Sequence, residues 1–159
     1  MEPRIVYTKF SPDAFQALET LEKRVHSASL GETLLNLVKM RASQINGDVY
    51  CLDIYSKAAR ASGETEQRLY VLNAWREAPY YTPRERAALE WTESLTLIAQ
   101  THVPDEVFQG VVKEFTVQEL VDLTYAVIAV NGLNRLSISM RAIPGQYPEA
   151  YSHAKSSGS

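Results

Sequence analysis

The stretch "INGDVYCLDIYSKAARASGETEQRL", residues 45–69, decides the fold class, because helix boundaries and helical runs follow one another within it. Asn46-Gly47 is typical of a turn, and Asp48 directly after it is a favoured N-cap residue. No proline or glycine then occurs until residue 63, where a glycine closes the run. The stretch predicts one helix over 48–62 and another over about 64–75.

Similar signals recur on both sides of this stretch. Ser11-Pro12 reads as an N-cap followed by a first-turn proline, and "TPRE" at 82–85 has the spacing of a capping box. No strand-like alternation follows residue 10, so we predict an all-α helical bundle of six or seven helices. The further helices are expected over 12–26, 32–45, 83–101, 103–115 and 116–142.

The length of 159 residues favours one domain. Residues 1–10 are expected to be an extended N-terminal segment, and 11–143 the helical domain. Residues 144–159, "PGQYPEAYSHAKSSGS", are expected to be a flexible C-terminal tail, because they are rich in small and polar residues and hold no helical pattern.

The composition argues against several classes of protein. The net charge is −3 and the basic residues are scattered, so the sequence shows no basic cluster of the kind that binds a nucleic acid. No apolar run approaches the roughly 20 residues that span a bilayer, and the first residues lack a signal-peptide pattern. A single cysteine excludes an internal disulfide. These features predict a cytoplasmic protein without membrane or nucleic-acid partners.

The only cysteine, Cys51, has the polar residues Asp48 and Tyr55 near it in the sequence. On a helix, Asp48, Cys51 and Tyr55 stand at i, i+3 and i+7 and therefore share a face. The helix N-terminus favours a thiolate at Cys51, while the carboxylate of Asp48 opposes it, each by on the order of 1 kcal/mol or less. The plainer interpretation is that Asp48 is a helix cap and Cys51 a small buried group.

Three phrases of the sequence are specific: "SQING" at 43–47, "GETEQRL" at 63–69 and "TPRERAAL.WTE" at 82–93. On these phrases the chain resembles the alkylhydroperoxidase (AhpD-like) and carboxymuconolactone decarboxylase family, and the resemblance extends over about residues 11–142. It implies an all-α AhpD-like fold and an alkylhydroperoxidase-type oxidoreductase or a decarboxylase. It also implies a homo-oligomer, because members of the family are commonly oligomers.

In dithiol members of this family, two cysteines, a histidine and a glutamate carry the chemistry. This sequence matches only one of the four positions, because Cys51 is the second cysteine. Asp48 stands at the first cysteine position, Tyr55 at the histidine position and Asn36 at the glutamate position. The resemblance therefore implies that the dithiol peroxidase activity is absent or much reduced.

Three functions remain open for Asn36, Asp48, Cys51 and Tyr55, which we expect to face one pocket. The first is a lost activity, with substitutes that preserve packing. The second is non-redox acid–base catalysis on a small molecule, with Asp48 as general base and Tyr55 as proton or hydrogen-bond donor. The third is single-cysteine redox chemistry, in which Cys51 forms a sulfenic acid that an external thiol reduces.

No cofactor or metal is expected. The three histidines, His26, His102 and His153, are far apart in the sequence and show no ligand spacing. Asn131 and Asn134, three residues apart on the most apolar predicted helix, share a face. We expect them to satisfy helix ends or a subunit contact, or alternatively to line the mouth of the pocket.

Overall fold

The structure, a computed structural model, describes residues 2–26 and 29–147, and its regular elements are all helical. These residues form eight α-helices and two short 3-10 helices, with no strand among them, so the all-α prediction is confirmed. In chain order the elements are η1 (Tyr7–Lys9), α1 (Pro12–His26), α2 (Glu32–Asn46), α3 (Val49–Ala61), α4 (Glu66–Tyr70), η2 (Leu72–Ala74), α5 (Pro83–Thr96), α6 (Ile98–Thr101), α7 (Asp105–Val111) and α8 (Val117–Met140).

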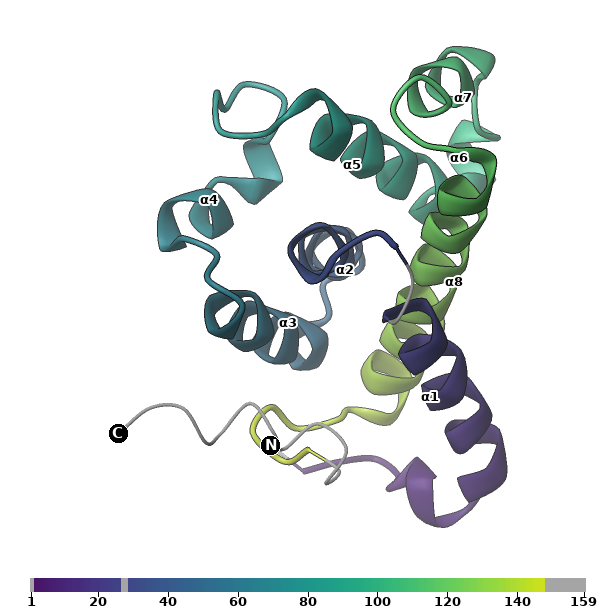
Figure 1. The fold of residues 1–159 in the computed structure, drawn as a ribbon. Coiled ribbons are helices and arrows are strands. Elements are labelled where there is room, and N and C mark those ends of the chain that lie inside the picture. The colour runs from purple at the N-terminus through teal and green to yellow at the C-terminus, as the bar shows by residue number, and fades with distance from the viewer. Residues whose placement is uncertain (1, 27–28, 148–159) are drawn as a thin grey trace.

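Helix α2 forms the centre of the bundle. Its apolar residues lie on most sides of the helix, which is the pattern of a helix buried all round, and Leu35, Leu37 and Val38 are completely buried. It packs against α3, α5 and α8, and Figure 1 shows it nearly end-on with these helices around it. Residues near the C-terminal end of α2 are therefore held on several sides.

Helix α8 is the longest element and forms one side of the bundle. It packs against α1, α2, α3 and α5, and it runs down the right side of the view in Figure 1, between α7 above and α1 below. It begins with a capping box, in which Thr116 and Glu119 satisfy each other's backbone amides. Because α8 reaches both α2 and α3, its side chains meet the turn between those two helices.

Two predicted helices are interrupted. The segment expected to be helical over 64–75 divides into α4 and η2, because the Tyr81 hydroxyl donates to the Arg68 carbonyl, which a continuous helix would offer to Leu72. The segment over 83–101 breaks at Leu97. There the Thr101 hydroxyl donates to the Ser94 carbonyl at 2.7 Å. The prediction that the second of these helices starts with the capping box at 82–85 is confirmed.

The two ends of the described chain lie together below α3 in Figure 1. The Arg4 amide donates to the Met140 carbonyl at 2.9 Å, which joins the first residues to the end of α8. The N-terminal segment is not extended throughout, because Tyr7–Lys9 forms a 3-10 turn. Of the expected tail, residues 148–159 lie outside the described residues. In residues 2–26 and 29–147, no helix has both the length and the apolar character needed to cross a bilayer.

Candidate functional site

A tight turn between α2 and α3 positions Asp48 and Cys51. Gly47 ends α2 in the left-handed conformation at φ 72°, a region that glycine enters without steric cost. Asp48 is then the N-cap of α3, as the sequence predicted, and Cys51 lies in the first turn of that helix. Only two residues separate the helices, so the cap and the thiol are both fixed against the centre of the bundle.

The Asp48 carboxylate is buried and fully hydrogen bonded. Its Oδ1 accepts from the backbone amides of Tyr50 at 3.0 Å and Cys51 at 3.2 Å. Its Oδ2 accepts from the Asn134 amide at 2.8 Å and from the Ser137 hydroxyl. With 1% of its surface exposed, this side chain has no access to solvent. Four donors therefore hold the carboxylate as a junction between α3 and α8.

A layer of amides extends this junction to α2. The Asn46 amide donates to the side-chain oxygens of Asn131 at 3.0 Å and Asn134 at 2.8 Å, and Asn134 donates to the Ser43 hydroxyl at 3.1 Å. Arg135 donates to the Asn131 side chain at 3.1 Å. Asn131 and Asn134 thus join α8 to side chains near the end of α2 and the start of α3, and do not bond the free backbone groups at either helix end. Neither lines the cavity beside Cys51.

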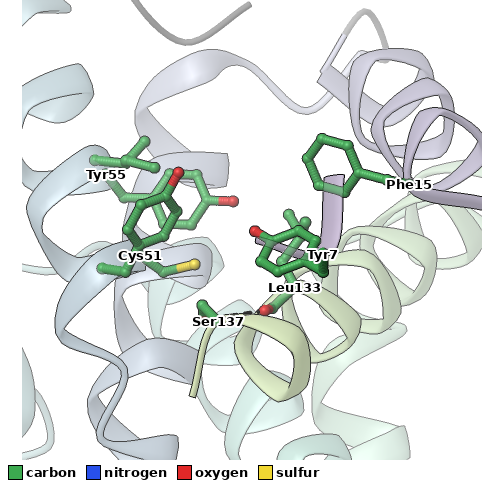
Figure 2. Close-up of a pocket in the computed structure, with 8 residues that line it drawn as sticks. Tyr7, Phe15, Cys51, Tyr55, Leu133 and Ser137 are labelled. Atoms are coloured by element: carbon green, nitrogen blue, oxygen red, sulfur yellow. Dashed lines mark hydrogen bonds between the residues drawn. The ribbon is translucent and has the colours of Figure 1, made fainter. Parts of the chain in front are cut away.

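The Cys51 thiol faces a very small cavity. The side chain is 2% exposed, and beside it Tyr7, Phe15 and Leu133 help to enclose a free volume of about 10 Å³. That volume is roughly the least that holds one water molecule. Figure 2 shows the sulfur turned toward this space, with aromatic rings from the N-terminal segment and α1 across from it. The thiol is therefore enclosed mainly by apolar and aromatic groups.

The surroundings of Cys51 keep the thiol protonated. Burial raises its pKa above the ordinary value, and the charge of Asp48 and the hydrogen bond to that carboxylate raise the pKa further. Hydrogen bonds from Asn134 and Ser137 act in the opposite direction and have smaller effects. The balance between helix dipole and carboxylate, left open by the sequence, is overridden by burial, which disfavours a thiolate.

Tyr55 lines the same cavity as Cys51, but its hydroxyl is engaged elsewhere. It donates to Glu22 of α1 at 3.4 Å, and the Lys39 ammonium of α2 forms a buried ion pair with the same carboxylate oxygen. The Lys39 nitrogen also lies 5.4 Å from the centre of the Tyr55 ring. Tyr55 is thus part of a buried charged cluster that joins α1, α2 and α3.

Asn36 does not lie at this cavity. Its amide donates to the Ser62 hydroxyl at 3.2 Å, near the far end of α3. The expectation that four side chains face one pocket is therefore corrected: Cys51 and Tyr55 line the cavity, whereas Asn36 and Asp48 do not. The physical reason is that each of these two polar groups finds hydrogen-bond partners within the helix packing, as buried polar groups require.

Several neighbours of Cys51 were not identified from the sequence. Tyr7 and Phe15 approach from the N-terminal segment and α1, and Leu133 and Ser137 from α8. The i, i+4 spacing of Leu133 and Ser137 signals that they share a face, but no local pattern places that face against Cys51.

The site offers little to a metal ion. Across the described part of the chain, His, Cys, Asp and Glu side chains do not gather in a group of three that could hold one. His153 and the side chain of His26 lie outside the part that can be described. At Asp48 and Cys51, one carboxylate and one thiol are the available donors, and the carboxylate is already saturated with hydrogen bonds.

Comparison with known proteins agrees with this architecture. Residues 12–94 match the carboxymuconolactone decarboxylase family, and these residues include the whole α2–α3 junction. This chain belongs to that family. The family region ends within α5, so α8, which supplies Asn134 and Ser137, lies beyond the matched residues.

Relatives of the chain share this family fold. The uncharacterized protein YdfG of Bacillus subtilis is 39% identical over 140 residues, which cover 88% of this chain and 95% of YdfG. The structure of ATU0492 from Agrobacterium tumefaciens, a protein of unknown function with a suggested AhpD antioxidant-defence role, superimposes with a TM-score of 0.88. It is 39% identical, and the match covers 92% of this chain and 100% of that chain.

More distant structures show the same fold. A peroxidase-related protein from Silicibacter sp. TM1040 is 20% identical, with a TM-score of 0.77. That match covers 95% of this chain and 79% of the other. The AhpD-like fold predicted from the sequence is therefore confirmed.

Proposed function

We propose that this family member does not reduce peroxides by a dithiol mechanism, and that its former active site is a structural junction. The observation that supports this most is the state of Asp48, the residue at the first cysteine position. Its carboxylate is buried and accepts four hydrogen bonds, two from α3 and two from α8. It acts as a cap and a cross-link between helices.

The chemistry of peroxide reduction supports the same proposal. A thiolate attacks one peroxide oxygen, breaks the O–O bond and becomes a sulfenic acid, while the other oxygen leaves as an alcohol or water. A second thiol then condenses with the sulfenic acid, which forms a disulfide and releases water. A carboxylate at residue 48 cannot form that disulfide. Any oxidised Cys51 would depend on a thiol from outside the chain.

Access to Cys51 is also poor for a single-cysteine reaction. The thiol is 2% exposed and its pKa is raised, so little thiolate is present at neutral pH. The free volume beside it, about 10 Å³, is too small for an organic hydroperoxide. Both features favour the lost-activity interpretation over single-cysteine redox chemistry.

Acid–base catalysis by Asp48 and Tyr55 has less support than loss of activity. Such catalysis needs both groups within hydrogen-bond reach of one substrate. Asp48 does not line the cavity, and the Tyr55 hydroxyl donates to Glu22 at 3.4 Å. The two groups therefore do not converge on an empty space in this conformation.

The decisive experiment measures peroxide consumption and the state of the thiol together. The reduced protein is mixed with hydrogen peroxide or cumene hydroperoxide and a dithiol reductant, with Cys51→Ser as the control. We expect both proteins to consume peroxide at the same background rate, and intact-mass spectrometry to show Cys51 still reduced after minutes. Turnover that depends on Cys51 would overturn the proposal. Rapid addition of one oxygen at Cys51, reversed by external thiol, would favour the single-cysteine alternative.

A further inference from the structure

A second, larger hollow lies between the two ends of the described chain. It has a volume of about 330 Å³ and is lined by residues within 3–8 and 142–147 together with Tyr50 of α3. This volume is at the lower end of the roughly 300–1,000 Å³ found for small-molecule sites. Most of its walls lie outside residues 12–94, which match the family, so the hollow belongs to this chain's own end segments.

Both segments are tied to the end of α8. The Arg4 guanidinium donates to the Ser139 carbonyl at 3.1 Å, in addition to its backbone bond to Met140. On the other side, the Ala142 amide donates to the Ser137 carbonyl at 2.8 Å. The Tyr147 ring packs edge-on against Tyr50 with 5.3 Å between centroids. These contacts fix the walls of the hollow.

The walls indicate the kind of molecule that the hollow accepts. None of the described residues that line it carries a charge. Ile5, Val6 and Ile143 are apolar, and Tyr7, Tyr50 and Tyr147 present aromatic rings, which favour edge-on or offset contacts with another ring. The Lys57 ammonium donates to the Tyr147 hydroxyl at 3.5 Å, but it is already paired with Asp53 at 2.8 Å. An anion that gave up water to enter the hollow would therefore meet no unpaired countercharge, which is costly. A neutral, flat molecule avoids the cost of transferring a charge.

The hollow also adjoins the thiol. Tyr7 and Tyr50 line both the hollow and the small cavity at Cys51, so these side chains form the wall between the two spaces. Tyr7 is held on its other side by Phe15, with ring centroids 5.4 Å apart. A molecule in the hollow therefore lies next to the wall that covers the sulfur.

We propose that the hollow between residues 3–8 and 142–147 is a binding site for a small neutral molecule with one aromatic ring. The Gln146 amide and the Thr8 hydroxyl, which also line the hollow, are the polar groups available to a carbonyl or hydroxyl on such a ligand. The site does not depend on redox chemistry at Cys51, so it goes beyond the proposed function.

The first test compares two probes of equal shape and different charge. Binding of acetophenone and of benzoate to the full-length protein is titrated by protein-detected NMR, with saturation-transfer spectra as a second readout. We expect acetophenone to bind with a dissociation constant in the millimolar range or tighter. Benzoate should bind about tenfold more weakly or worse, because its charge is not compensated by the walls. Equal affinity for the two probes would overturn the proposal.

Variants then locate the site. Ala142→Trp and Ile5→Trp each place a large ring in the hollow and should abolish acetophenone binding, while Ala14→Trp, at an exposed position of α1, should leave binding unchanged. Far-UV circular dichroism confirms that each variant is folded, and Ile5→Trp is the safer change because Ile5 is 47% exposed. Binding that survives in a folded Ile5→Trp protein would place the ligand elsewhere and refute the assignment.

A last readout tests the position beside the thiol. Saturating acetophenone should slow the labelling of Cys51 by a small thiol reagent several-fold in the wild type, and should have no effect in Ile5→Trp. An unchanged labelling rate in the wild type would contradict a ligand lying against Tyr7 and Tyr50. These outcomes are independent of peroxide consumption, so this proposal and the proposed function succeed or fail separately.

Discussion

Replacing Asp48 by alanine removes the group that joins α3 to α8. The side chain accepts from the Cys51 and Tyr50 amides at the start of α3, and from Asn134 and Ser137 on α8. Asp48→Ala leaves these donors without their common acceptor, while the cavity at Cys51 changes little because Asp48 does not line it. The change therefore tests the junction itself.

The expected loss of stability follows from these contacts. Loss of an aspartate N-cap costs about 1 kcal/mol. The buried Asn134 amide loses one acceptor, which costs about 1–3 kcal/mol, although its bond to Ser43 remains. Loss of the bond from the Ser137 hydroxyl to Asp48 costs little free energy, because the Leu133 carbonyl at 3.0 Å is an alternative acceptor. Removing a buried charge relieves part of its desolvation cost, so we expect a net loss of about 2–3 kcal/mol.

Urea unfolding at one fixed protein concentration measures this free energy. The matched control is Asp53→Ala on the same helix, because Asp53 pairs with Lys57 at 2.8 Å near the surface and should cost about 1 kcal/mol or less. A double-mutant cycle with Asn134→Ala should give a coupling energy of about 1 kcal/mol or more. If Asp48→Ala lowers the free energy of unfolding no more than Asp53→Ala does, the carboxylate is not a structural junction and the reasoning is refuted.

Three further results are expected. Asp48→Asn should lower the apparent pKa of Cys51, measured from the pH dependence of thiol labelling, because it removes a charge that raises that pKa; an unchanged value would assign the effect to burial alone. A hydrogen bond from the Thr116 backbone amide and another from the Arg84 side chain lower the pKa of Glu119 from 4.5 to about 2. The stability that Glu119 contributes is therefore present above pH 4.5 and is lost as the pH falls toward 2. Glu119→Gln should therefore flatten the fall of stability in that acid range, as followed by urea unfolding at each pH. On the outer face of α8, within 117–128, apolar side chains are exposed, Tyr125 at 48%, and we expect them to be covered in a homo-oligomer. Light scattering after size exclusion should then show several subunits in the wild type and a lower mass for Tyr125→Glu, and a monomeric wild type would contradict this.

The features that could be predicted from the sequence are those set by neighbouring residues. The cap at Asp48 and the capping box at Thr82 depend on contacts three residues away, and the structure shows both. The end of α2 at Gly47 follows from the conformational freedom of glycine. Such features can be predicted because the residues that determine them lie within a few positions of one another in the sequence.

The features that could not be predicted depend on distant residues. Asp48 and Asn134 are 86 positions apart, and nothing in the pattern of α8 indicates that its amide reaches α3. Likewise, the break after α4 depends on a hydroxyl from Tyr81, which overrides a local preference for helix. The wall over Cys51 comes from Tyr7, in a segment whose sequence gives no sign of its partners.

The buried pair of Lys39 and Glu22 has a consequence for the history of this sequence. Both side chains are nearly inaccessible, at 2% and 7% exposure, and losing either partner alone strands a charge in the interior, which typically costs about 3–5 kcal/mol. Exchanging both for apolar groups of similar volume is often neutral. Either single substitution therefore destabilises the protein, and it is tolerated only when the second substitution accompanies it. We expect homologous sequences to retain both residues or neither, so that positions 22 of α1 and 39 of α2 covary.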